Sequence, residues 1–268
     1  MKILRPQYPL TVMCRVFDVS RSGYHAFASR SPSKRARENA RLEVAIQAAH
    51  RRTRESYGPA RLQDELKDDG VTAGVGRIKR LRKKLGLRCK QVRKFKATTN
   101  SNHRLPVAPN LLEQNFDSTR PNETWVTDIT YVATDEGWLY LSGVKDLHTC
   151  ELVGHAMGNR MTKDLVGRAL VKAVSAKRPG PGLIHHSDRG SQYCSQDYQA
   201  LLQQFRMKAS MSRRGNCYDN APMESFWGTL KNELVYHRRY ETREQARREI
   251  TEYIEIFYNR QRRHSRLG

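Results

Sequence analysis

The chain has 268 residues, and its 49 Lys and Arg against 27 Asp and Glu give a net charge of +22. A surplus of this size indicates a polyanionic partner, for which nucleic acid is the first candidate. The five Cys are scattered without a Cys-x-x-Cys pair, and the sequence has no signal peptide and no run of 18 apolar residues. These features argue against a disulfide framework, a zinc finger and a membrane protein, and we expect a cytoplasmic location.

The positive charge is concentrated in the first part of the chain. Residues 1–105 contain 26 Lys and Arg against 8 Asp and Glu, whereas residues 106–236 contain 14 of each and residues 237–268 contain 9 against 5. A generic solvated surface would mix the two signs. We therefore expect a basic, nucleic-acid-binding arm in front of a charge-balanced core.

Residues 1–32 have the pattern of a small helix-turn-helix segment. Apolar residues recur at helical spacing in two short runs between residues 9 and 28, and Ser20 is placed to cap the second run. From Ser33 to about Arg54 we expect a longer amphipathic helix. This helix leads into a second helix-turn-helix-like module, which we expect to span residues 33–96.

Two further helices are predicted between residues 59 and 86, with a turn from Gly70 to Gly74. The second helix is strongly basic around a stripe of Ile and Leu, so its charged sides would face phosphate while the stripe is buried. A solvated helix face without a ligand is the alternative interpretation. The cations expected to contact DNA are Arg77, Lys79, Arg80, Arg82, Lys83 and Lys84.

An irregular linker is predicted at residues 97–121, which include three Pro. Residues 122–236 then predict an α/β domain that begins with antiparallel strands. The expected elements are strands at 125–132, 138–144 and 152–157, a helix after Thr162, a strand at 183–187, a helix after Ser195, a strand ending near Met211, and a helix beginning at Asn220 and Pro222. A last helix, with a capping box formed by Thr242 and Gln245, is expected within residues 237–268.

Three carboxylates of the predicted α/β domain could form a metal site. Asp128 interrupts an apolar and aromatic strand, Asp188 ends a strand beside Gly190, and Glu224 follows a helix start where the helix dipole favours its ionised form. Phosphodiester exchange is served by two metal ions about 3.5 to 4 Å apart, and Mg²⁺ needs only a few carboxylates. Spacing alone leaves open that Asp128 and Asp188 are capping residues or partners of Arg.

Three motifs in order closely resemble the DDE transposases of bacterial insertion sequences, in particular the second-reading-frame product of the insertion-sequence-three group. The motifs are Trp125–Tyr131, His186–Tyr193 and Ser212–Phe226. Asp188 and Glu224 are separated by 35 residues, and Lys231 follows Glu224 by seven positions, as in that group. The similarity extends over nearly the whole chain.

The resemblance implies an α/β fold with an RNase H-like catalytic core, a mixed five-stranded sheet flanked by helices, preceded by small all-α helix-turn-helix modules. It assigns Asp128, Asp188 and Glu224 as catalytic residues that bind Mg²⁺, for which Mn²⁺ can substitute. The implied enzyme is a polynucleotidyl transferase, in which water nicks the DNA and the freed 3′-hydroxyl attacks another phosphodiester. No zinc is expected, because the zinc-binding His and Cys residues of retroviral integrases have no counterpart here.

Residues beside the three carboxylates are expected to contact DNA or to support the site. Lys231 would lie near the scissile phosphate, with a solvated lysine as the alternative, and Trp227 or Tyr193 could stack on a splayed base. Further DNA-binding candidates are Arg213 and Arg214, and the expected supporting residues are Asn220, His186 and Gly190.

The expected partners are double-stranded DNA, as insertion-sequence ends and as target, and further copies of the chain in a synaptic complex within the bacterial nucleoid. The upstream-frame product, with which the second frame is often fused in this group, is another candidate partner. The family motif is expected to continue beyond Gly268, so the C-terminal segment is expected to be truncated. Two other functions fit parts of the pattern: a non-catalytic DNA-binding regulator, and a nuclease that hydrolyses DNA without joining it.

Overall fold

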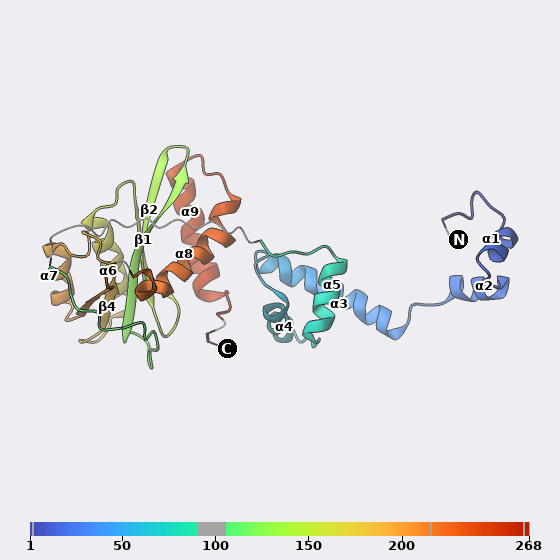
Figure 1. Cartoon of the computed structure of the whole chain (residues 1–268), viewed down its shortest axis with the longest axis horizontal. Coiled ribbons are helices and arrows are strands. Elements are labelled where there is room, and N and C mark those ends of the chain that lie inside the picture. The colour runs from blue at the N-terminus through green and yellow to red at the C-terminus, as the bar shows by residue number, and fades with distance from the viewer. Residues whose placement is uncertain (2, 91–105, 215, 265, 268) are drawn as a thin grey trace. The chain divides into compact units, whose positions relative to one another are not determined.

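The computed structural model describes residues 1, 3–90, 106–214, 216–264 and 266–267. The chain divides into two units, Met1–Arg88 and Cys89–Gly268, each of which is described by itself (Figure 1). The end of the predicted second module, 91–96, and the first part of the predicted linker, 97–105, lie outside the described residues. Among the helices that are described, none is long and apolar enough to cross a membrane.

The first unit is helical, as predicted. Its helices are α1 (Leu10–Val16), α2 (Arg21–Ser29), α3 (Lys34–Arg52), α4 (Pro59–Asp68) and α5 (Val75–Lys84). The hydroxyl groups of Ser20 and Ser33 accept hydrogen bonds from the first turns of α2 and α3, so both predicted caps are confirmed. Helices α3, α4 and α5 enclose a core in which Ile46, Leu62 and Ile78 are fully buried.

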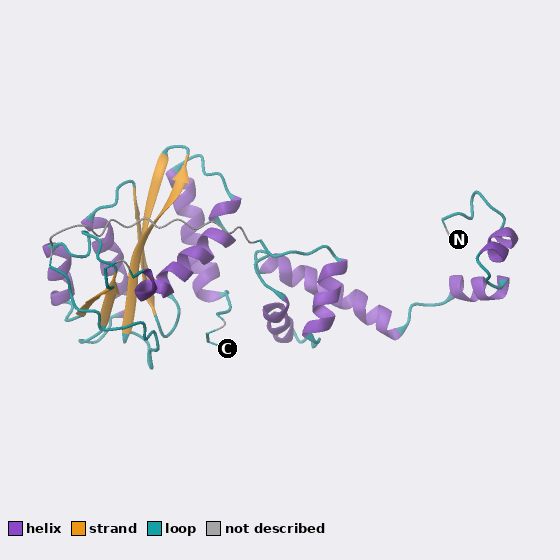
Figure 2. Cartoon of the chain, in the orientation of Figure 1, coloured by secondary structure: helices purple, strands orange, loops and turns teal. Residues whose placement is uncertain are grey.

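The second unit is organised around β1 (Thr124–Thr134), the central strand of a five-stranded sheet in the order β3-β2-β1-β4-β5 (Figure 2). β2 (Gly137–Asp146) is antiparallel to β1, and β3 (Leu152–Gly158) is antiparallel to β2. On the other side, β4 (Ile184–Ser187) is parallel to β1, and β5 (Lys208–Met211) is parallel to β4. This mixed sheet confirms the predicted α/β class.

Helices cover both faces of the sheet because successive strand residues alternate between two cores. Trp125 of β1 packs against α6 (Lys163–Lys177) and α7 (Gln196–Gln204), whereas Val126 packs against α8 (Ala221–Glu233) and α9 (Arg243–Glu252). Two residues after Val126 comes Asp128, which therefore belongs to the α8 face. The shorter helical segments are η1 (Cys217–Asn220), η2 (Val235–His237) and η3 (Tyr253–Tyr258), of which the last is a π-helix that directly follows α9.

Two segments are more firmly attached to the sheet than the sequence pattern indicated. Residues 106–121 were expected to be linker, yet Leu112 is buried in the α8 face core and the Leu111 amide donates to Ser210 Oγ. The final helix was placed outside the core domain, yet Ile250 and Ile254 are fully buried in that same core. Both differences have one cause: each segment carries apolar side chains whose partners are distant in sequence.

Candidate active site

Asp128 lies in the middle of β1 and is oriented by a residue of α8. Its carboxylate Oδ2 accepts a hydrogen bond from the indole Nε1 of Trp227 at 3.0 Å. Opposite Asp128 on β2 is Gly143, where a methyl group would lie 2.9 Å from Cη2 of Trp227. The glycine therefore leaves the space in which the Trp227 ring reaches the strand.

Asp188 is placed beside Asp128 by the parallel pairing of β1 and β4. Val126 pairs with His186, so Asp128 and Asp188 each stand two residues beyond the last registered pair, and Asp188 is close enough for its charge to raise the pKa of Asp128. Asp188 Oδ1 accepts a hydrogen bond from the backbone N–H of Gly190 at 2.9 Å. The predicted supporting position of Gly190 is thus next to Asp188, where a methyl group would come within 3.0 Å of that oxygen.

Glu224 lies in the first turn of α8, where the helix dipole favours a carboxylate. Two buried side chains attach this helix start to the sheet. The Asn220 amide Nδ2 donates to the carbonyl oxygen of Thr127 at 3.1 Å, and Lys145 Nζ donates to the carbonyl oxygen of Pro222 at 3.3 Å. Sequence reasoning had singled out Asn220 but not Lys145, because a lysine on a strand ordinarily reaches solvent.

The electrostatics of the site oppose the ionisation of its carboxyl groups. Burial, followed by the charge of Asp188 and more weakly that of Glu224, raises the pKa of Asp128 to about 8. Burial also raises the pKa of Glu224. Such a set of mutually repelling carboxylates is stabilised by a cation.

Lys231 is close enough to Asp128 to interact with it. Burial lowers the pKa of Lys231, and the charge of Asp128 partly offsets that effect. Its Nζ lies 5.2 Å from the centre of the Tyr131 ring, a cation–π contact. The alternative of an entirely solvated lysine does not describe this partly buried side chain.

The donor set suits a hard divalent cation, since Mg²⁺ is commonly held by one or two carboxylates and completes its shell with water and phosphate oxygens. In the part of the chain that is described, no three His, Cys, Asp or Glu side chains are arranged to hold one ion. The charge of Asp188 nevertheless acts on Asp128 more strongly than that of Glu224 does, so Asp128 and Asp188 are the candidate pair on the sheet side, with Glu224 on α8.

Comparisons with known proteins show which family the chain belongs to. A family model described as an integrase core domain matches residues 118–217, another of the same description matches residues 205–268, and an HTH-like domain model matches residues 36–95. The insertion element IS600 uncharacterized 31 kDa protein of Shigella sonnei is 63% identical over 96% of this chain and 94% of its own. Transposase InsF for insertion sequence IS3A of Escherichia coli (strain K12) is 42% identical over 98% of this chain and 92% of its own.

This chain belongs to the IS3 family of insertion-sequence transposases. It is a DDE transposase, a polynucleotidyl transferase built on an integrase core. Among solved structures, the HTLV-2 integrase catalytic core domain in complex with magnesium aligns with 53% of the transposase and 91% of its own chain, with a TM-score of 0.42 and 17% identity.

A buried carboxylate that sequence reasoning missed organises the loop before Glu224 in this transposase. Asp219 is fully buried and accepts hydrogen bonds from the backbone and guanidinium of Arg213, and from the side chains of Asn110 and Gln114. The hydrogen bonds from Arg213 hold the pKa of Asp219 down to about 2. Arg213, expected to bind DNA, thus pairs with a carboxylate of the protein although its side chain is 55% exposed, and its neighbour Arg214 is also exposed.

Aromatic and imidazole residues near the carboxylates belong to the interior of the transposase. His186 bridges β4 to the chain around β5 through contacts of 2.8 Å with Ser210 Oγ and 3.2 Å with Ser212 Oγ, and burial lowers its pKa to about 4. This is the structural role expected for it. Trp227 and Tyr193, which were candidates for stacking on a base, are 5% and 1% exposed and present no free ring face.

The predicted DNA-binding helix α5 exposes only some of its cations. The expectation that all its basic residues face solvent is wrong for Arg82, which is 7% exposed because it lies on the side that packs into the module. Arg77 Nε donates to Asn39 and Lys84 Nζ pairs with Glu43, both on α3. The exposed cations of the helix are Lys79, Arg80, Lys83 and Lys84, of which Lys84 forms the ion pair with Glu43.

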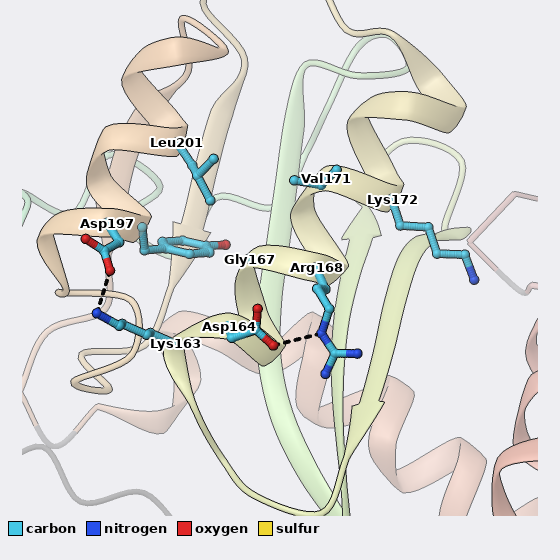
Figure 3. Close-up of a pocket in the computed structure, with 9 residues that line it drawn as sticks. Lys163, Asp164, Gly167, Arg168, Val171, Lys172, Asp197 and Leu201 are labelled. Atoms are coloured by element: carbon cyan, nitrogen blue, oxygen red, sulfur yellow. Dashed lines mark ion pairs between the residues drawn. The ribbon is translucent and has the colours of Figure 1, made fainter.

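A separate groove of about 580 Å³ lies between α6 and α7, which cover the sheet face opposite to Asp128 (Figure 3). Its rim carries two ion pairs, Lys163 with Asp197 and Arg168 with Asp164. Leu201 contributes to its apolar lining. Because its charges are paired and it lies away from the carboxylates, it is distinct from the candidate active site.

Proposed function

We propose that Asp128, Asp188 and Glu224 are the catalytic residues of this transposase and that they bind Mg²⁺, with Mn²⁺ as a substitute. The observation that carries the proposal is the β1–β4 register: its last pair is Val126 with His186, and Asp128 in β1 and Asp188 just after β4 each follow that pair by two residues. The raised pKa of Asp128 supports it, because two adjacent carboxyl groups without a cation do not readily ionise together.

The carboxylates would hold the metal from three places in the fold: β1, the residue that directly follows β4, and the first turn of α8. When bound, the ions supply the charge that activates the attacking oxygen and stabilises the leaving oxygen. The protein contributes orientation: Gly190 fixes Asp188, and Asn220 fixes the start of α8 against the strand of Asp128. Lys231 would contact a DNA phosphate near Asp128.

The proposed substrates are the double-stranded ends of an insertion sequence and a target duplex in the bacterial nucleoid. We propose that the module at residues 33–96 binds DNA through the exposed cations of α5, with Arg214 as a further contact. Copies of the chain would assemble on paired ends, and the upstream-frame product would join them as a fusion or a partner. The segment at residues 1–32 would extend this basic arm.

The test is strand transfer of a labelled duplex that carries the element's end sequence, with Mg²⁺ or Mn²⁺. We expect Asp188→Asn to lose cleavage and joining by at least about 10³-fold, a loss typical of removing a group required in the transition state. Asp135→Asn, which changes a half-exposed carboxylate on the β1–β2 hairpin, is the matched control and should remain active.

Joining at the wild-type level by Asp188→Asn would contradict the proposed catalytic set. Cleaved ends without joined products, from wild-type protein supplied with cognate ends and target, would instead identify a nuclease that only hydrolyses DNA.

A further inference from the structure

We propose that Trp227 is a positioning residue for catalysis: its indole N–H fixes the carboxylate of Asp128 in the orientation used for metal binding. This inference rests on the proposed catalytic role of Asp128. Its basis is the hydrogen bond of 3.0 Å from Trp227 Nε1 to Asp128 Oδ2, which joins α8 to the centre of β1.

The Trp227 ring is held rigidly enough to orient another side chain. Trp227 is 5% exposed and lies in the core between the sheet and α8, with its ring 4.8 Å from that of Phe226. A methyl group on Gly143 would come within 2.9 Å of Trp227 and within 3.0 Å of Leu152, so the surroundings leave little room for another ring position.

The chemistry of the donor suits this role. A carboxylate next to Asp188 and Glu224 needs a fixed rotamer, but a lysine or arginine donor would neutralise it and compete with a metal ion. The indole N–H is a donor without a net charge. It therefore orients one oxygen of Asp128 while leaving the negative charge available to a cation.

Trp125 provides an internal comparison, because it makes the same kind of bond outside the active site. Its Nε1 donates to Asp146 Oδ2 at 3.1 Å, and Asp146 also accepts from the backbone amides of Asn122 and His148. Asp146 is thus a carboxylate surrounded by structural donors, whereas Asp128 faces the carboxylates of Asp188 and Glu224, with Lys231 also near it. A comparison of Trp125 with Trp227 therefore distinguishes the general effect of losing an indole–carboxylate hydrogen bond from its specific effect at the proposed metal site.

The first experiment observes the bond directly in the full-length protein. The chain contains three Trp, so a ¹⁵N-labelled sample has three indole N–H resonances. We expect Asp128→Asn to shift the resonance of Trp227 and to leave those of Trp125 and Trp138 in place. Mg²⁺ should shift the same resonance in the wild type but not in Asp188→Asn.

If the indole N–H resonance of Trp227 has the same chemical shift in Asp128→Asn as in the wild type, the inference is overturned. A resonance that responds to Asp128→Asn but not to Mg²⁺ would support the bond and contradict the metal site of the proposed function. The failure of one proposal is therefore distinguishable from the failure of the other.

The second experiment compares Trp227→Phe with Trp125→Phe, each of which keeps an aromatic ring and removes the N–H. By calorimetry, Trp227→Phe should weaken Mn²⁺ binding about 10- to 100-fold, the usual effect of losing a group that orients a metal ligand. Trp125→Phe should leave Mn²⁺ affinity unchanged even if it lowers the melting temperature. The melting temperature in EDTA shows whether Trp227→Phe is folded. If the folded variant binds Mn²⁺ with wild-type affinity, Trp227 has a packing role alone and the inference is overturned.

Discussion

The side chain of Asn220 donates a hydrogen bond to the backbone carbonyl of Thr127 at 3.1 Å, and so joins the start of α8 to the strand residue that precedes Asp128. Glu224 lies on α8 one turn after Asn220, and Asp128 follows Thr127 on β1. The bond therefore links the elements that carry two of the proposed catalytic carboxylates.

Replacement of Asn220 by Ala should lower both the free energy of unfolding and the rate of strand transfer. Leaving the buried Thr127 carbonyl without its donor costs about 1 to 3 kcal/mol, whereas a misplacement of about 1 Å at a catalytic site can cost on the order of 10²-fold in rate. Asn220→Asp, which keeps the shape but replaces the donor with an acceptor, should behave like the Ala variant. The measurements are joining rates and urea unfolding, with the exposed Asn159→Ala as control. Normal joining by Asn220→Asp would show that this bond does not position the site.

The stability of the metal-free protein should depend on pH through Asp128. Its pKa is raised to about 8 by burial and by Asp188, so the folded protein retains a proton that the unfolded chain releases near its ordinary pKa of 3.8. The folded state binds more protons between these values, and the contribution of this group to stability therefore falls as pH rises from about 4 to about 8.

Asp128→Asn removes the group whose ionisation lowers the stability of the folded protein as pH rises, while keeping a hydrogen-bond acceptor for Trp227. In EDTA, the melting temperature of the variant minus that of the wild type should increase steadily from pH 5 to pH 8. Asp135→Asn, on the same hairpin, is the control. A difference that is constant across this range would mean that Asp128 ionises at its ordinary pKa.

Asp219→Asn should destabilise the second unit. The change removes the charge that receives hydrogen bonds from Arg213, Asn110 and Gln114, and bonds to a charged group contribute about 1.5 to 3 kcal/mol each. We expect the free energy of unfolding to fall by about 3 kcal/mol at pH 7, which urea unfolding measures. The wild type should lose the same stabilisation in acid, as pH falls from about 4 towards the lowered pKa of about 2.

The matched control for Asp219 is Asp164→Asn, which breaks an exposed pair with Arg168 and should change stability by less than about 1 kcal/mol. Equal effects of the two substitutions would contradict a structural role for the buried carboxylate.

The exposed cations of α5 should account for much of the salt dependence of DNA binding. Replacing Lys79, Arg80 and Lys83 together by Ala removes three cations, and each phosphate contact contributes about 0.9 to the slope of log affinity against log salt concentration. We therefore expect the slope to become shallower by about 2 to 3, measured by fluorescence anisotropy over a salt series. Lys163→Ala with Lys172→Ala, at the α6 groove, is the control on the other unit. An unchanged slope in the α5 variant would place the DNA contacts elsewhere.

The sequence by itself determined the elements and the family. Helical and alternating periodicity placed α3 to α9 and β1 to β5 close to their observed positions, because these patterns depend on neighbours a few residues apart. The motifs around Asp128, Asp188 and Glu224 indicated the DDE transposase class, since the residues that define the class are contiguous within each motif.

Only the tertiary structure decided which side chains meet. The Trp227 bond to Asp128 spans 99 positions and the Asn110 bond to Asp219 spans 109, and no local pattern encodes such pairs. The same reason explains why a basic helix could not reveal that Arg82 is buried, and why residues 106–121 resembled a linker. Periodicity identifies the face of an element that is buried, but the identity of its partner depends on how distant elements pack.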